Sequence, residues 1–159
     1  MSLTDDFKAA LASWASGVSV VTTNSGGELY GLTVSSFSSL SLDPPLILVC
    51  LKNENKLPSM IAEAEGFAVS ILSREQEEAS NYFARANRPA TTGFTEIEGR
   101  WTPSGQPVIE GALATIVCEL QDSLPQGDHT IVVGRVIQAE TSEGEPLLYY
   151  RRKYRGVTG

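Results

Sequence analysis

The chain has 159 residues, and 12 lysines and arginines against 19 aspartates and glutamates give it a formal charge of −7 at pH 7. Its length is close to that of one typical domain, and 42% hydrophobic with 19% charged residues is typical of a folded globular chain rather than a disordered one. The acidic balance, without a run of five lysines or arginines, opposes binding to nucleic acid or to anionic membranes. We therefore predict one domain over residues 1–159, with neither as a partner.

The start of the chain and its cysteines indicate a cytoplasmic protein. Asp5 and Asp6 stand where a secretory signal would be basic and then apolar, and the longest apolar run, residues 44–51, is only strand-sized. Cys50 and Cys118 lie among apolar neighbours without a Cys-x-x-Cys spacing. We expect two buried, reduced thiols and no membrane anchor.

The first predicted elements are a helix and a hairpin. Thr4 is the expected N-cap of a helix that continues to Gly17, with apolar residues at helical spacing and acidic residues in its first turn. The β-branched run from Val18 to Thr23 and the run over 29–34 then flank a turn at 24–27 that contains two glycines. This pattern is typical of a β-hairpin.

The rest of the chain alternates strands with two further helices. Prolines in the turn at residues 43–45 separate two strands, and Ser73 is the expected N-cap of the last helix. A polar excursion over residues 86–93 is predicted to be mobile, and a turn is predicted at 125–128. The predicted strands are 37–42, 45–51, 67–72, 111–120, 130–140 and 146–150, and the predicted helices are 56–64 and 75–83.

About seven strands with two or three helices predict a mainly β fold. An antiparallel barrel, closed or nearly closed, is favoured because closure removes the exposed edges of such a sheet. The strands are not separated by regular crossover helices, and the Gly-x-Gly-x-x-Gly fingerprint is missing, so a Rossmann sheet is disfavoured.

Several classes of active site are excluded because the residues that they require are missing from the sequence. With a single histidine, His129, the chain cannot supply a multi-histidine zinc site, and it has no phosphate-binding loop or nucleophilic-serine motif, so we predict no metal. A thiol hydrolase that pairs a cysteine with His129 is disfavoured because apolar surroundings raise the pKa of a thiol.

Six hydroxyl side chains occur within residues 33–41. Hydroxyls and nearby backbone N–H groups can hold a phosphate or a polar heterocycle, with Val34 and Phe37 as an apolar wall. The alternative interpretation is a serine-rich strand with one solvated face.

Longer motifs distinguish these interpretations. The chain resembles the flavin reductase-like, FMN-binding split-barrel family over nearly its whole length. The segments that carry the resemblance are 14–23 (WASGVSVVTT), 31–37 (GLTVSSF), 39–46 (SLSLDPPL), 67–72 (FAVSIL), 111–114 (GALA), 127–129 (GDH), 134–136 (GRV) and 146–149 (PLLY).

The resemblance implies a six-stranded antiparallel Greek-key split barrel with a few flanking helices. It also implies a homodimer that binds FMN, or FAD, and reduces it with NADH or NADPH, in many members for a partner monooxygenase. The implied cofactor-binding residues are Thr33, Val34, Ser35, Ser36, Ser39, Cys50, Leu51, Lys52, Asn55, Lys56 and Tyr154.

Two departures from the family pattern affect this list. Asn55-Lys56-Leu57 stands where many members have a threonine after Ser or Arg, so the amide and the ammonium would replace a hydroxyl. The glycine usual before the tyrosine is missing, although Tyr154 is retained. A packed aromatic is the alternative role of Tyr154.

His129 has two interpretations. A lone histidine at a turn is often a surface or capping residue. In the resemblance, the Gly127-Asp128-His129 triplet lies near the nicotinamide, and Asp128 influences the orientation of the ring. Hydride transfer needs no proton abstraction from the donor, so His129 is expected to position the nucleotide. A non-catalytic electron-transfer module and a pyridoxamine-phosphate oxidase-like barrel enzyme remain the alternatives.

Overall fold

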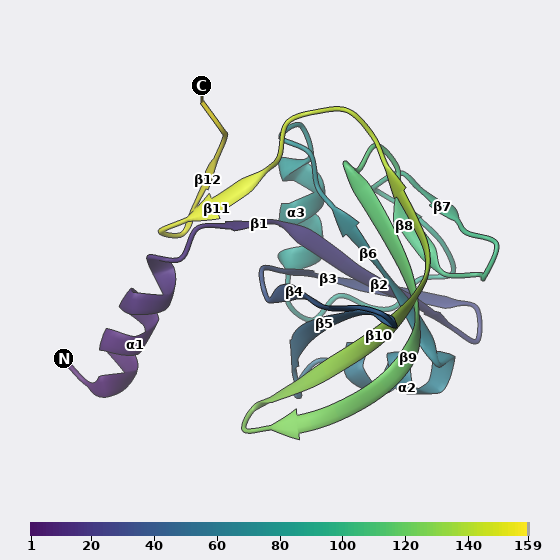
Figure 1. Cartoon of the computed structure of the whole chain (residues 1–159), viewed down its shortest axis with the longest axis horizontal. Helices are drawn as coiled ribbons and strands as arrows, with labels where there is room; N and C mark the ends of the chain where they lie inside the picture. Colours follow the sequence, from purple (N-terminus) through teal and green to yellow (C-terminus); the bar gives the residue numbers. More distant parts are fainter. Residues whose placement is uncertain (159) are drawn as a thin grey trace.

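The computed structural model describes residues 1–158, which form a mainly β fold with three helices (Figure 1). The helices are α1 (Leu3–Ala12), α2 (Leu57–Ala64) and α3 (Glu77–Ala84). The strands are β1 (Ser16–Gly17), β2 (Ser19–Ser25), β3 (Glu28–Val34), β4 (Phe37–Leu42), β5 (Pro45–Lys52), β6 (Gly66–Ile71), β7 (Gly99–Trp101), β8 (Pro107–Ile109), β9 (Ala114–Gln126), β10 (His129–Thr141), β11 (Leu148–Tyr150) and β12 (Lys153–Arg155).

One curved antiparallel sheet forms the body of the molecule. Its order is β3-β2-β6-β9-β10-β5-β4, so it has seven strands where six were expected. The strands β3 and β4 are consecutive in the chain, yet they are the two edges of this sheet, and only Ser35 and Ser36 separate them. The two ends of the sheet therefore meet at this connection without a ladder between them, which leaves the barrel split.

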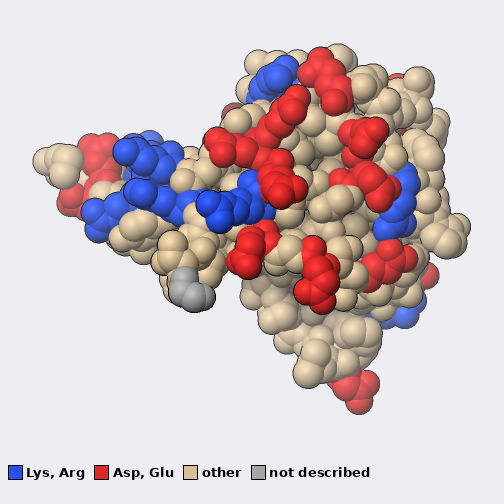
Figure 2. Space-filling model, turned by 90° about the horizontal axis from the view of Figure 1, so that it is seen from above, with Lys and Arg blue, Asp and Glu red and all other residues tan. Residues whose placement is uncertain are grey.

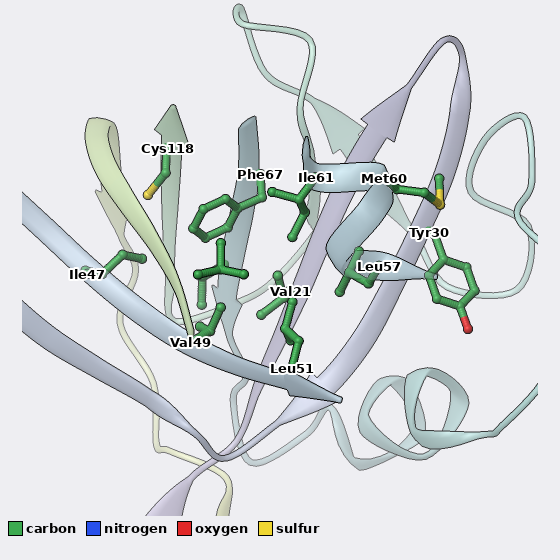
Figure 3. Packing of buried hydrophobic residues seen from close by; sticks show 12 residues of the cluster. Val21, Tyr30, Ile47, Val49, Leu51, Leu57, Met60, Ile61, Phe67 and Cys118 are labelled. Carbon is green, nitrogen blue, oxygen red and sulfur yellow. The ribbon is translucent and has the colours of Figure 1, made fainter. Parts of the chain in front are cut away.

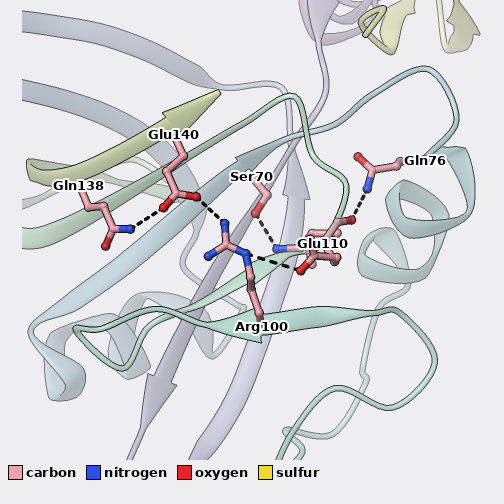
Figure 4. A network of polar contacts seen from close by, with 7 residues as sticks. Ser70, Gln76, Arg100, Glu110, Gln138 and Glu140 are labelled. Atoms are coloured by element: carbon pink, nitrogen blue, oxygen red, sulfur yellow. Dashed lines mark hydrogen bonds and ion pairs between the residues drawn. The ribbon is translucent and has the colours of Figure 1, made fainter. Parts of the chain in front are cut away.

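Two small sheets complete the fold. The order of one is β1-β11-β12, and the other pairs β7 with β8. None of β1, β7, β8 and β12 was predicted, and residues 16–17 were assigned to the first helix, because two or three residues are too few for an alternating pattern. Arg100 on β7 joins its small sheet to β10 through a 2.6 Å hydrogen bond to Glu140, and its Nε lies 3.5 Å from Glu110 (Figure 4). The backbone N–H of Ile109 donates to Ser70 Oγ on β6 at 2.9 Å.

The predicted helix starts were wrong by a few residues. Ser2, not Thr4, is the N-cap of α1, because its hydroxyl accepts from the backbone of Asp5 while the Asp5 carboxylate accepts from the backbone of Ser2. The helix ends at Ala12, before Gly17. Ser73 does not cap α3; its backbone N–H donates to Gln76, and the helix begins at Glu77.

The hairpin between β9 and β10 is longer than predicted. Only Gly127 and Asp128 form its turn, and the φ of 61° at Gly127 fits the first central position of a two-residue hairpin turn. Pro125, expected in the turn, lies within β9. A proline is tolerated there because β6 pairs with β9 only as far as Glu119, so β9 is an edge strand beyond that residue.

The core fills the barrel and continues under α2 (Figure 3). Val49, Phe67 and Ile61 are fully buried and pack in one cluster, and each such side chain contributes about 1.5 to 3 kcal/mol by leaving water. Burial raises the pKa of Cys118 to about 12, so this thiol is neutral, as expected. Cys50 differs from the prediction because its side chain is only half-buried.

The helix α1 stands apart from the barrel (Figure 1). None of its residues is buried, and Leu3, Phe7 and Leu11 form an exposed apolar stripe. A backbone hydrogen bond from Arg151 to Ala12, 3.0 Å long, joins the end of α1 to the turn between β11 and β12. Within residues 1–158, no helix combines the length and the apolar character that crossing a membrane requires.

Candidate functional site

A cavity of about 440 Å³ opens at the split of the barrel, beside the connection between β3 and β4. Its wall combines the end of β3, the end of β5, the start of β10 and the segment after α3. Nine of the predicted site residues line it: Thr33, Val34, Ser35, Ser36, Cys50, Leu51, Lys52, Asn55 and His129.

The hydroxyl groups in this wall have different tasks. Thr33 Oγ1 donates to the backbone oxygen of Ser80 at 2.6 Å and so ties β3 to α3. Ser36 Oγ donates to the Cys50 carbonyl at 2.8 Å and accepts from the Cys50 N–H at 3.3 Å, which fixes the connection against β5. Ser35 is exposed, and no hydrogen bond of its hydroxyl is found within residues 1–158. Ser35 therefore offers the most available hydroxyl to a ligand.

The end of β5 supplies backbone and charge. Leu51 is 1% exposed and belongs to the core, so it can offer a ligand only its backbone. The side chain of Lys52 is largely exposed and pairs weakly with Glu54, at 3.8 Å. Together with the amide of Asn55, its ammonium gives this side of the cavity donors suited to an anionic group.

His129 begins β10 directly opposite Lys52 in the antiparallel register. Its Nδ1 lies 2.7 Å from Asp128 Oδ1, and its side chain is 38% exposed. The hydrogen bond and the charge of His129 lower the pKa of Asp128, which keeps the carboxylate ionised. Because Nδ1 is engaged by Asp128, Nε2 is the ring atom left to contact a ligand.

Asn53 anchors the turn that carries His129, and this residue was not among the predicted site residues. Its backbone N–H donates to the Asp128 carbonyl at 2.9 Å, and its Nδ2 donates to the Gly127 carbonyl at 3.3 Å. Its Oδ1 accepts from Thr130 Oγ1 at 2.6 Å. These contacts join the end of β5 to both sides of the turn; an asparagine just after a strand was the only sequence signal for them.

Three predicted residues lie outside the lining of this cavity. Ser39 is exposed on β4, and the ammonium of Lys56 lies 4.7 Å from the centre of the Tyr30 ring. Tyr154 is 2.7 Å from Ser80 Oγ and donates to Asn81 at 2.9 Å, beside a neighbouring cavity of about 200 Å³. The binding roles of all three stay predictions.

The segment after α3 completes the wall and was also missed. Ala84, Arg85 and Ala86 line the cavity, although residues 86–93 were predicted to be a mobile excursion. Arg88 holds this segment in place, because its guanidinium donates to the carbonyls of Gly31 and Phe83 and stacks on three aromatic rings. An arginine in a proline-containing polar stretch gave no distinctive signal.

The arrangement suits a flat heterocycle with a polar tail. The cavity has apolar lining that includes Val34 and Ala84, polar side chains such as Ser35, and a volume in the usual range of ligand sites. Among the residues that the structure describes, no three His, Cys, Asp or Glu side chains gather as metal ligands would.

Comparison with known proteins agrees with this geometry. Residues 11–158 match the model of the "Flavin reductase like domain". The chain is 43% identical over 150 residues, 94% of this chain and 93% of the other, to the reductase component of 4-hydroxyphenylacetate 3-monooxygenase from Thermus thermophilus. It is 39% identical to an NADH-dependent flavin reductase from Rhodococcus, with 93% of this chain and 83% of the relative covered.

Solved structures share the whole fold. The flavin reductase PheA2 in its native state superimposes with a TM-score of 0.90 at 33% identity, and all of both chains is covered. The Streptomyces globisporus NADH:FAD oxidoreductase SgcE6, in complex with NAD and FAD fragments, gives a TM-score of 0.91 at 31% identity over 98% of this chain and 93% of the other. The chain therefore belongs to the flavin reductase-like domain family.

Proposed function

We propose that the protein is an NAD(P)H-dependent flavin reductase that binds FMN or FAD in the cavity at the split. The observation that carries the proposal is the gathering of nine predicted residues, from three separate parts of the chain, around one cavity of about 440 Å³. The residues fit a flavin, since Val34 and Ala84 offer apolar surface to a ring system while Ser35, Lys52 and Asn55 offer donors to a ribityl phosphate.

A bound flavin supplies the acceptor for the hydride of the nicotinamide. The chain's own contribution is orientation. Asp128 holds the His129 ring through Nδ1 and leaves Nε2 free to hold the carboxamide or a phosphate of the nucleotide. Asn53 fixes the turn beneath this pair. A hydride donor held in place needs no base, so these residues act by positioning the nucleotide.

Delivery of reduced flavin to a partner oxygenase follows from the same proposal. Relatives are named as reductase components of monooxygenases that act on 4-hydroxyphenylacetate and on 4-nitrophenol. We assign the same role to this chain. We also propose that it is cytoplasmic, because its nicotinamide substrate is an intracellular cofactor.

We also propose a homodimer. The apolar stripe of α1, formed by Leu3, Phe7 and Leu11, is exposed on a helix without a buried residue, and a second copy would cover it. Sedimentation at micromolar concentration tests this: a particle of 17.1 kDa that still binds flavin contradicts the dimer.

The activity is tested by an absorption spectrum with added FMN or FAD, followed by anaerobic titration with NADH and NADPH. We expect rapid bleaching of the flavin band at a rate that saturates with nucleotide. If the protein binds flavin but neither nucleotide reduces that flavin, the alternative function, a non-catalytic electron-transfer module, is favoured and the proposal is contradicted.

His129→Ala refines the test. We expect the variant to have a lower kcat/KM for the nucleotide, corresponding to a loss of about 0.5 to 3 kcal/mol of transition-state stabilisation, because one hydrogen bond is removed. Flavin affinity and the melting temperature should stay near those of the wild type. An unchanged kcat/KM with both nucleotides removes His129 from the site.

A further inference from the structure

Gln106, just before β8, has a buried side chain with one unused donor. The residue is only 8% exposed, and its Oε1 accepts from the backbone N–H of Asn24 at 3.1 Å. This contact fixes which end of the amide is the oxygen, because a backbone N–H cannot donate to an NH₂ group. The Nε2 atom then has no hydrogen-bond partner within residues 1–158. A buried donor without a partner is costly, so this amide needs an acceptor from outside the chain.

The amide of Gln106 belongs to the wall of a cavity of about 560 Å³. The end of α2, the start of β6, the β7–β8 turn and the middle of β9 form this cavity, which we call the α2-end cavity. Gly66 leaves room beside the amide, since a Cβ at this position would lie 3.1 Å from Nε2. The α2-end cavity shares no lining residue with the cavity at the split, and none of its lining residues belongs to α1, β11 or β12. The dimer contact proposed for α1 therefore does not involve it.

The end of α2 favours a positive charge in this cavity. The last carbonyl oxygens of an α-helix have no partners within the helix, and the negative end of the helix dipole lies there. The last turn of α2 contains no basic residue that could bond these oxygens. Ala62, Ala64 and Glu65, at this end of the helix, line the cavity. A cationic donor in the cavity would therefore lie beside the end of α2.

Two carboxylates strengthen the preference for a cation. Glu65 and Glu119 both line the cavity and are exposed. Glu119 is paired with Arg135, whereas Glu65 takes part in no ion pair within residues 1–158. The whole chain has a charge of −7, and on the face seen in Figure 2 acidic side chains spread over the body while basic ones gather beside α1. The uncompensated charge of Glu65 favours a cation over an anion such as a phosphate.

We propose that the α2-end cavity binds a small ligand that carries both a guanidinium or ammonium group and a carbonyl oxygen, as a basic amino-acid amide or a basic residue of a short peptide does. The cation lies against Glu65 and the end of α2, and the carbonyl oxygen accepts from Gln106 Nε2. Ala62 and Ile137 offer apolar surface to the alkyl part of the ligand. This site goes beyond the proposed function and does not depend on it.

Three probes separate the two contacts. Nα-acetylargininamide carries the cation and the carbonyl, butylguanidine carries the cation alone, and Nα-acetylcitrullinamide is the uncharged analogue of the first. Binding to the full chain is measured by calorimetry, and the NMR signal of the Gln106 side-chain NH₂ is followed during each titration. We expect acetylargininamide to bind about tenfold more tightly than either of the other probes, because each of them lacks one contact. Acetylargininamide, unlike butylguanidine, should shift the Gln106 signal.

Glu65→Gln and a matched control test the charge. Glu63→Gln is the control, because Glu63 lies in the last turn of α2 but outside the cavity lining, where it accepts from Ser25 at 3.1 Å. We expect Glu65→Gln to bind acetylargininamide about tenfold more weakly and the control to lose less than about threefold. Both glutamates are exposed, so the melting temperatures of the two variants should stay near that of the wild type.

A peptide distinguishes the two sources of this chemistry. Tighter binding of acetyl-Gly-Arg-Gly-amide than of acetylargininamide indicates a peptide ligand, and weaker binding indicates a free small molecule. Four results overturn the inference: no binding of acetylargininamide to the wild type at millimolar concentration, equal affinity for all three probes, equal losses in the two glutamate variants, or a Gln106 signal that does not move in the bound state. The last result would mean that water alone satisfies the amide. None of these measurements involves the reduction of flavin by NADH, so failure of this inference leaves the proposed function untouched.

Discussion

The contact between Asn53 and Thr130 connects stability to activity, and Asn53→Ala tests that connection. The substitution keeps the backbone N–H that donates to Asp128 but removes the amide, which accepts from Thr130 Oγ1 and donates to the Gly127 carbonyl. The turn that orients His129 then loses its side-chain attachment to β5.

The magnitude follows from the two lost bonds. The bond from Thr130 is short, 2.6 Å, and Thr130 is only 8% exposed, so its hydroxyl is left without an acceptor away from water. The bond to Gly127 is longer, 3.3 Å, and exposed, and it contributes less. We expect Asn53→Ala to reduce the free energy of unfolding by about 2 to 3 kcal/mol.

A double-mutant cycle with Thr130→Val isolates the contact. Valine removes the hydroxyl that Asn53→Ala would leave unpaired, so the two changes together should cost less than the sum of the single costs. Asn53→Asp is the comparison variant, because it keeps the acceptor for Thr130 but replaces the donor to the Gly127 carbonyl with a carboxylate oxygen, which repels that carbonyl.

Urea unfolding and steady-state kinetics with NADH are measured on the same preparations. We expect Asn53→Ala to lower kcat/KM severalfold, mainly through KM, with a smaller loss of flavin affinity, because the backbone N–H of Asn53 still holds the segment that carries Lys52 and Asn55. Wild-type stability and kinetics in Asn53→Ala, or strictly additive effects in the cycle, refute the anchoring role.

Three other predictions concern single residues. Ser35→Ala should weaken flavin binding by about 0.5 to 1.5 kcal/mol at unchanged stability, whereas Ser36→Ala should lower the urea midpoint because its hydroxyl fixes Cys50; equal behaviour of the two variants contradicts this division. Gly134→Ala should destabilise by about 1 to 3 kcal/mol in urea, since a Cβ would lie 2.5 Å from Phe67; normal stability shows that the interior can relax. Hydrogen bonding from Gln138 and then Arg100 holds the pKa of Glu140 below its ordinary value of 4.5, so its stabilising effect is present above that pH and is lost as the pH falls through the lowered pKa. The difference in urea midpoint between wild type and Glu140→Gln should therefore shrink below pH 4.5, and a constant difference contradicts it.

The longer strands were predictable because each one carries its own pattern. Residues 45–51 and 67–72 were predicted as strands, and the structure has β5 at Pro45–Lys52 and β6 at Gly66–Ile71. Apolar, β-branched runs of this length between turn residues favour buried strands over helices. The short strands of the small sheets carry no pattern of their own. The strand β1 depends on β11, near the other end of the chain, and the short hairpin of β7 and β8 is joined to β10 through the hydrogen bond from Arg100 to Glu140.

The site was predictable as a region but not as a set of roles. The hydroxyl-rich segment does line the cavity, yet the sequence does not show that Thr33 is bonded to Ser80, 47 residues away, or Ser36 to Cys50. Such partners are set by the strand order. The same order brings Asn53 to the turn before His129, which is why this anchor was missed.

The position of the site has a topological cause. Because β3 and β4 are the two edges of one curved sheet, the chain must cross from one edge to the other through Ser35 and Ser36 alone. Sheet edges are usually covered to prevent unwanted pairing, and here α3 packs along β3 while the connection is fixed by Ser36 to β5. The connection leaves a short gap at Ser35, with a cavity on each side of it. The imperfect closure of the barrel thus creates the space for a ligand, and the loops and hairpins around that gap supply its polar contacts.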